Sequence, residues 1–230
     1  MKRLFIFITG IMMAVAATSR TFNMKQLGAD AKGIKPCTKL INQTIEKAAS
    51  EGGGTIYFPA GTYLTATIHM KSNITLHLES GAIVRFSDRF EDYLPFVTAR
   101  WEGTVMQTLS PLIYAHSADN LTITGRGTLD GNGLKWWLWE FETRKVIKEN
   151  GGKLPSLDKL QQMWVDANKD LEISDYYKPS LERKMFRPPF IQFYECTNIL
   201  IENVKIINSP FWTVNPAFCD NVTIHGVTIN

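Results

Sequence analysis

Cysteine and histidine are scarce in this 230-residue chain, which has three of the first and four of the second. An odd number of widely spaced cysteines does not make a disulfide framework, although one pair could form in an oxidising compartment. Buried thiols are an equally good interpretation. The histidines show no spacing of the kind that holds a metal ion. We therefore expect no metal site and no cofactor.

A strong excess of one charge is also missing. The chain has 25 Lys and Arg against 22 Asp and Glu, a formal net charge of +3. Loss of Lys2 and Arg3 with a leader would leave 23 basic residues against 22 acidic ones. Such a balance gives no reason to expect nucleic acid as a partner. The hydrophobic share of 44% is that of an ordinary folded domain.

Only one long hydrophobic run is present, and it lies at the N-terminus. A basic start is followed by the apolar run Leu4–Val15 and by the small-residue site Ala14–Ala16, which is the pattern of a signal peptide. The run is short for a membrane span, so a single anchor is the less favoured alternative. We expect residues 1–17 to be a signal peptide and residues 18–230 to form one partial domain. The protein should be secreted or periplasmic, with no stable membrane anchor after cleavage.

A 23-residue repeat organises the end of the chain. The segments "CTNILIENVKII" from Cys196 and "CDNVTIHGVTIN" from Cys219 match in residue type without a gap, and looser copies begin at Asp119 and Ser72. Each copy has an Asn, alternating apolar residues, a Gly or Asn break and a second short apolar strand. A period of this length is typical of repeat architectures.

Short strands of this kind bury their apolar sides by stacking on the next copy. Strands that run in one direction stack as parallel ladders about 4.8 Å apart, so we predict an all-β fold, a right-handed parallel β-helix. Cys196 and Cys219 would then lie at equivalent places on adjacent coils, close enough for a disulfide, although an unpaired stack is the simpler interpretation. A β-sandwich is the alternative, but it needs tight hairpin turns, and candidates such as Asp130-Gly131 are few.

Two segments depart from the strand pattern. Apolar residues from Leu40 to Ala49 follow helical spacing, with Thr38 placed as the N-cap. This predicts an amphipathic helix that caps the open end of the solenoid. Between about residues 132 and 187 the repeat disappears, and Ser156–Leu171 could be helical. We expect a partly helical insertion that leaves the stack on one face.

Several stretches together resemble the polygalacturonases of glycoside hydrolase family 28. They cover most of Phe22–Asn230 in the family's order: "FNMKQLGADAKG", "EGGGTIYFPAGTY", "SNITLHLESGAIV", "GRGTLDGNGLKWW", "RPPFIQFYECTNILIENVKIINSPFWTVNP" and "CDNVTIHGVTIN". The glycine-rich stretch is shared with pectate lyases and phage tailspikes, whereas the long "RPPF" stretch is more specific. The resemblance implies a pectin-lyase-like solenoid and a secreted glycosidase. Its substrate would be pectin-type polygalacturonan, cleaved at O-glycosidic bonds by an inverting mechanism with two carboxylates.

The catalytic residues that the resemblance implies do not occur in this sequence. The family's Asn-Thr-Asp, Asp-Asp, Gly-His-Gly and Arg-x-Lys motifs follow the coil that "CDNVTIHGVTIN" resembles, and none of the four is present. We expect them after Asn230, with this chain as an N-terminal part that is truncated at the C-terminus and inactive alone. Asp119, Asp130 and Asp220 fall at coil corners, where Asp forms turns, and no catalytic role is expected for them.

Two residues are candidates for contact with the polysaccharide. Trp212 could stack on a sugar ring, and Arg187 could bind a uronate carboxylate. The structural alternatives are a wedge at a coil corner for Trp212 and a pairing with a local acid for Arg187.

Two other functions share the architecture. A non-catalytic carbohydrate-binding or adhesin/tailspike-like β-helix module would hold a sugar chain without cleaving it. A calcium-dependent pectate lyase would need a cluster of acidic ligands on one strand face, and the sequence shows no such cluster.

Overall fold

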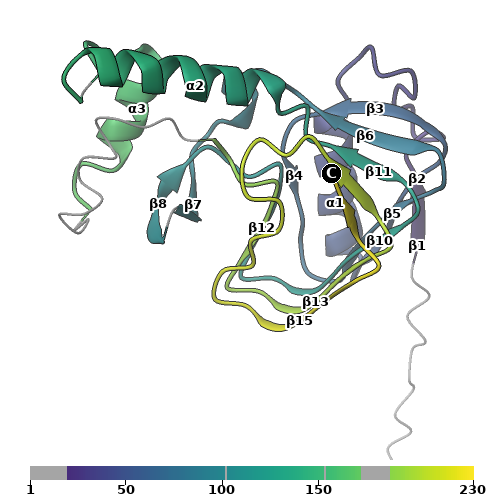
Figure 1. Ribbon diagram of the computed structural model, residues 1–230. Helices are drawn as coiled ribbons and strands as arrows, with labels where there is room; N and C mark the ends of the chain where they lie inside the picture. The colour runs from purple at the N-terminus through teal and green to yellow at the C-terminus, as the bar shows by residue number, and fades with distance from the viewer. Residues whose placement is uncertain (1–19, 102, 153, 172–186) are drawn as a thin grey trace, which may run out of the picture.

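The computed structural model of the chain describes residues 20–101, 103–152, 154–171 and 187–230 (Figure 1). The signal peptide expected at residues 1–17 lies outside these ranges. None of the helices in the described part has the length and the apolar character that a bilayer crossing requires.

Three parallel sheets form the body of the molecule, and successive turns of the chain add strands to each of them. Sheet A contains, in spatial order, β1 (Arg20–Asn23), β2 (Gly54–Phe58), β5 (Ile74–Leu78), β10 (Asp119–Gly125), β13 (Thr197–Glu202) and β15 (Asp220–His225). Sheet B contains β3 (Gly61–Thr65), β6 (Ala82–Phe86), β11 (Thr128–Asp130), β14 (Lys205–Ile207) and β16 (Thr228–Ile229). Sheet C contains β4 (Ile68–His69), β9 (Ile113–His116) and β12 (Ile191–Tyr194).

Every pairing within these three sheets is parallel. The parallel β-helix predicted from the sequence is therefore confirmed, and the β-sandwich alternative is excluded. A right-handed coil is the hand expected for parallel strands joined by crossovers.

Residues that are 23 positions apart in the sequence repeat pair with each other in the last two coils. Ile199 pairs with Val222 and Ile201 with Ile224, as the sequence alignment predicts. Inward side chains form columns through the stack. One column in sheet A, with no member more than 1% exposed, consists of Ile56, Leu76, Ile123 and Ile201. Because each buried aliphatic side chain stabilises the fold by about 1.5–3 kcal/mol, these columns hold the coils in register.

An asparagine ladder marks the corner between sheets C and A. Asn73, Asn120, Asn198 and Asn221 all have positive φ, between 54° and 64°. The side-chain amide of each donates to the Oδ1 of the one before it, at 2.7–3.2 Å. Asn tolerates this left-handed conformation better than most residues with a side chain. The bend and the ladder together explain why Asn opens every copy of the repeat.

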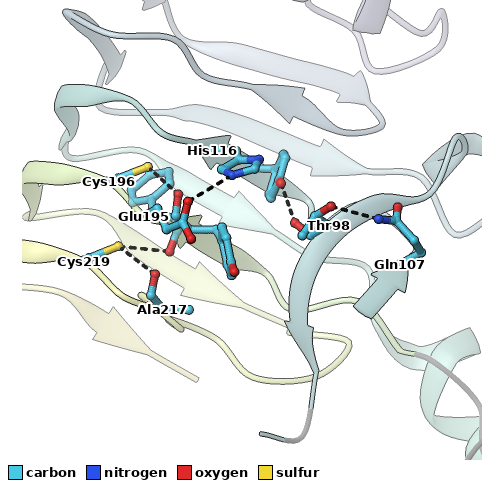
Figure 2. Close-up of polar contacts among 10 residues, drawn as sticks. Thr98, Gln107, His116, Glu195, Cys196, Ala217 and Cys219 are labelled. Carbon is cyan, nitrogen blue, oxygen red and sulfur yellow. Dashed lines mark hydrogen bonds and ion pairs between the residues drawn. The ribbon is translucent and has the colours of Figure 1, made fainter. Parts of the chain in front are cut away.

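Cys196 and Cys219 are stacked on adjacent coils as free thiols (Figure 2). The Cys196 Sγ lies 3.3 Å from the carbonyl oxygen of Tyr194, and the Cys219 Sγ lies 3.1 Å from that of Phe193. Burial raises the pKa of the Cys196 thiol to about 11 and also raises that of Cys219. The two cysteines thus occupy equivalent places on adjacent coils, as predicted, and the structure describes both as free thiols.

The predicted amphipathic helix is α1 (Thr38–Ser50), which buries Ile41, Thr44, Ile45 and Ala48 and packs against strands of sheets A and C. The prediction that Thr38 is its N-cap is wrong, because Cys37 occupies that position. The Oγ1 of Thr38 instead accepts a hydrogen bond from the Ala66 N–H at 2.7 Å. Thr38 thus ties the helix to the turn between sheets B and C.

All the long excursions from the coil leave at one corner, between sheets B and C. The first follows β6 and contains η1 (Phe90–Tyr93) and the antiparallel hairpin of β7 (Val97–Trp101) and β8 (Thr104–Thr108). The second follows β11 and contains α2 (Leu134–Glu149) and α3 (Lys159–Ala167). Figure 1 shows these elements together on one side of the stacked strands.

The insertion predicted between about residues 132 and 187 is partly helical as expected, although residues 172–186 lie outside the described ranges. The first excursion was not anticipated. Its strands have the same alternation of apolar and polar residues as a coil strand, so the sequence pattern does not distinguish the two.

We predict that Asn198→Ala lowers the free energy of unfolding by about 2–3 kcal/mol, from lost ladder hydrogen bonds and from the strain of Ala at positive φ. Asn198→Gly removes the same amide, but glycine adopts positive φ without strain. This variant should therefore lower the free energy of unfolding by only about 1 kcal/mol. Urea unfolding of both variants measures the difference. Equal losses would contradict the role of backbone conformation at this corner.

Candidate functional site

The outer face of sheet C is the surface beside which the long excursions are built. The excursions leave between sheets B and C, whereas the other two corners are short. Only two residues separate β10 of sheet A from β11 of sheet B, and two separate β9 of sheet C from β10. In solenoids, insertions that gather on one face commonly build the binding face. The outward side chains of sheet C are therefore the candidate site.

Two clefts open at this same corner. One, of about 490 Å³, lies between α1 and the start of the first excursion and is lined in part by Thr38, Arg89 and Asp92. The other, of about 410 Å³, lies between the two excursions and is lined in part by Phe90 and Trp139. The first cleft is thus shared between the coil, the segment before α1 and the first excursion, whereas the second is lined by the two excursions.

Aromatic and imidazole rings form a strip across the outer face of sheet C. His69 of β4 meets Tyr114 of β9 edge-on, with ring centroids 6.0 Å apart. His116 and Tyr194 are 5.0 Å apart, and Tyr194 and Phe218 are 5.6 Å apart. Burial and the nearby Lys71 ammonium lower the pKa of His69, so its imidazole is neutral at pH 7. The signal for this strip was Tyr114 and His116 at alternate positions of "IYAH", matched one coil later by Tyr194 in "IQFY", and the sequence analysis missed it.

The β7–β8 hairpin is docked on this strip by polar contacts. The fully buried side chain of Gln192 accepts from the Arg100 N–H at 3.1 Å and donates to the Arg100 carbonyl at 2.8 Å. The Tyr114 hydroxyl donates to the Thr98 carbonyl at 2.5 Å. Within the hairpin itself, Gln107 of β8 donates to the Thr98 hydroxyl of β7 at 2.9 Å (Figure 2). The hairpin therefore covers Tyr114 and Gln192 and leaves the next coil as the exposed part of the face.

The corner between sheets C and A forms the opposite side of the face. His116 Nε2 lies 3.4 Å from Glu195 Oε2, and both side chains are partly exposed (Figure 2). Glu195 and Phe218 occupy equivalent places on successive coils and have positive φ of 53° and 55°. The ring of Phe218 is 62% exposed. Ser117 has the same conformation on the preceding coil, with φ of 49°, so this bend is a repeated feature of the corner that presents the Phe218 ring to solvent.

Arg187, predicted to bind a carboxylate of the substrate, is engaged within the protein. Its Nε lies 3.6 Å from Glu140 Oε2 of α2, and its Nη1 donates to the Pro210 carbonyl at 2.9 Å. The guanidinium also lies over the Phe211 ring, 4.9 Å from the centroid. This is the local pairing named as the structural alternative, and contact with substrate stays a prediction.

Trp212 lies on the loop that leads into the last segment of sheet C, and it is 39% exposed. Its ring stacks on Phe211 with centroids 4.8 Å apart and planes 14° apart. Phe211 in turn carries Arg187 on its ring. Trp212 is therefore supported from one side by an aromatic and guanidinium stack, and its stacking on a sugar stays a prediction.

The three corner aspartates have structural partners or turn positions. Asp130 is buried. Its carboxylate accepts a hydrogen bond from Arg85 Nε at 2.9 Å and another from Asn208 Nδ2 at 2.9 Å. Asp119 accepts from the Thr197 hydroxyl, and Asp220 begins β15. Among the described residues, no group of three His, Cys, Asp or Glu side chains is arranged to hold a metal ion.

A solenoid of three parallel sheets, with one insertion-flanked face, defines a pectate lyase-like parallel β-helix protein. A family model described as rhamnogalacturonase A/epimerase, pectate lyase-like matches residues 21–136, half of the chain. The chain belongs to this family. The resemblance to polygalacturonases of glycoside hydrolase family 28, expected from the sequence, is confirmed by the relatives that follow.

Three relatives show the likeness. The chain is 36% identical to an exopolygalacturonase of Thermotoga maritima whose structure is solved, with a TM-score of 0.73 over 92% of this chain and 47% of that one. It is 22% identical to the family 28 exopolygalacturonase of Yersinia enterocolitica, with a TM-score of 0.67 over 93% of this chain and 39% of that one. A Vitis vinifera protein named "Probable polygalacturonase" is 26% identical over 94% of this chain. The chain spans 38% of the length of that relative.

We predict that Glu140→Ala lowers the free energy of unfolding by about 2–4 kcal/mol. The carboxylate is 9% exposed and lies near the guanidinium groups of Arg144 and of Arg187, the second of which is 19% exposed. Its loss therefore removes charge-assisted contacts in a largely buried setting. Glu142→Ala, on an exposed position of the same helix, should change stability by less than about 0.5 kcal/mol. Denaturant unfolding measures both, and equal effects would contradict the pairing.

Proposed function

We propose that this chain is the part of a secreted polygalacturonan-cleaving glycoside hydrolase that builds one end of the substrate groove on sheet C. The single observation that supports this most is the docking of the β7–β8 hairpin across the sheet C face, beside a coil whose outward rings remain exposed. Relatives named as polygalacturonases favour the hydrolase over the non-catalytic module.

The proposed mechanism is inverting hydrolysis by two carboxylates. One carboxylic acid protonates the leaving glycosidic oxygen while a second carboxylate activates water on the other side of the sugar. The acid and base would come from coils that are not among these 230 residues, since the relatives are more than twice as long as the stretch matched here. The role of the described residues would be to bind and orient the uronate chain.

The hairpin also suggests where the sugar chain stops. Because Gln192 and Tyr114 are covered, a polysaccharide could lie on the coil of Trp212 and Phe218 but could not continue over the preceding coils. A groove closed in this way would favour cleavage near a chain end, and the names of two solved relatives, both exopolygalacturonases, agree with this.

We predict that the full-length protein, with every residue its gene encodes, releases reducing ends from polygalacturonate. The released sugar should first appear with inverted anomeric configuration, which proton NMR during the first minutes of reaction measures. An unsaturated product that absorbs in the ultraviolet would instead indicate a lyase. Binding without any cleavage would favour the non-catalytic module.

We predict that Trp212→Ala in that protein raises KM for oligogalacturonates about tenfold and changes kcat less, because a stacked ring contributes about 1–1.5 kcal/mol to binding. Trp212→Phe should recover part of the loss. Phe141→Ala removes another exposed aromatic ring, from α2, and should leave KM unchanged. An unchanged KM in Trp212→Ala would mean that Trp212 is only a corner wedge.

A further inference from the structure

We propose that Arg100, on the hairpin strand β7, binds the carboxylate of a uronic acid residue and selects an anionic sugar over a neutral one. This inference rests on the proposed function, because it assigns a residue to the specificity of the same groove. It also differs from the sequence analysis, which gave this role to Arg187.

The backbone of Arg100 is held rigidly against sheet C. The Gln192 side chain bonds both the N–H and the carbonyl of Arg100, in the way that a neighbouring strand would. On the other side of the hairpin Arg100 is paired with Val105 of β8. Because the backbone is already fixed, binding a ligand through Arg100 orders only its side chain.

Strand alternation directs the Arg100 side chain away from the core. Its neighbours Ala99 and Trp101 are 0% and 2% exposed, and Trp101 packs against Trp164 of α3 at 5.4 Å. Since successive side chains of a strand point to opposite sides, Arg100 points the other way. Its guanidinium carbon lies 6.0 Å from the centroid of the exposed Phe218 ring.

The guanidinium of Arg100 has no carboxylate partner among the described residues, whereas most of the other described arginines do. Ion pairs hold the guanidinium groups of Arg20, Arg85, Arg89, Arg144 and Arg187. A guanidinium carries five N–H donors in a planar fork that fits a carboxylate with two parallel hydrogen bonds. Arg100 is therefore a cation at the edge of a binding face with donors available to a ligand.

The surroundings of Arg100 fit a sugar acid better than a simple anion. Phe218 is 62% exposed and extends the ring strip formed by Tyr194 and His116. The C–H face of a pyranose can lie on such a ring while the carboxylate on its C5 reaches the guanidinium. Trp212 precedes and Phe218 follows the segment of residues 213–217 that adds to sheet C, so the two rings flank one coil.

The test measures binding of a sulfur-linked trigalacturonate, which a glycosidase does not cleave, and of its fully methyl-esterified counterpart, to the full-length protein by isothermal titration calorimetry. Arg100→Gln should weaken binding of trigalacturonate about 10- to 100-fold, the usual effect of losing charge-assisted hydrogen bonds. The esterified ligand should bind Arg100→Gln and the unaltered protein equally. Arg100→Lys keeps the charge but not the fork, and should recover only part of the affinity.

Arg126→Gln is the matched control. Arg126 is exposed on the short turn between sheets A and B, so the loss of its charge should leave trigalacturonate affinity unchanged. Unchanged affinity in Arg100→Gln, or equal losses for both ligands, would overturn the assignment of Arg100 while leaving the proposed function in place. Failure of the unaltered protein to bind either ligand would overturn the proposed function and this assignment with it.

Discussion

The hydrogen bonding between successive coils is the constraint on which the rest of this structure depends. In a parallel β-helix the backbone N–H and C=O groups of each strand are satisfied by the coils above and below, and the pairings of sheets A, B and C run through the whole described chain. An insertion inside a strand would leave buried backbone groups without partners. Extra chain can therefore enter only at corners, where the ladder is already interrupted.

The corners are not equivalent, and this difference creates the candidate site. At the corner between sheets C and A, the asparagine ladder uses side-chain amides to continue the hydrogen bonding between coils, which fixes the length of that turn. The turn between sheets A and B is held by Gly125 and Gly127, where an added Cβ would meet the backbone of Leu78 or Ala82 at 2.8 Å or less. Only the corner between sheets B and C is free to lengthen. Both long excursions occur there, and sheet C is the sheet that they flank.

The sequence predicted those features that repeat and missed those that occur once. The match of Cys196 with Cys219 gave the true register of two coils, because inward residues must align in every coil. The hairpin of β7 and β8 was missed because a strand on an excursion alternates as a coil strand does. Thr38 was misread as a cap because its partner, Ala66, lies far away in sequence. The candidate role of Arg187 met the same difficulty, because its ion-pair partner Glu140 lies 47 positions away in the sequence.

Arg187 and Arg100 show how a local acid decides which of two similar, partly exposed side chains remains available to a ligand. Arg187 lies under the loop of Trp212, where its charge has to be compensated locally, and Glu140, the Pro210 carbonyl and the Phe211 ring provide that compensation. Arg100 is likewise only partly exposed, but its guanidinium lies beside the Phe218 ring and has no carboxylate partner among the described residues. A carboxylate ligand could therefore pair with the Arg100 guanidinium without displacing an internal acid. An arginine in the first setting stabilises the wall of a groove, and one in the second can distinguish a charged sugar from a neutral one.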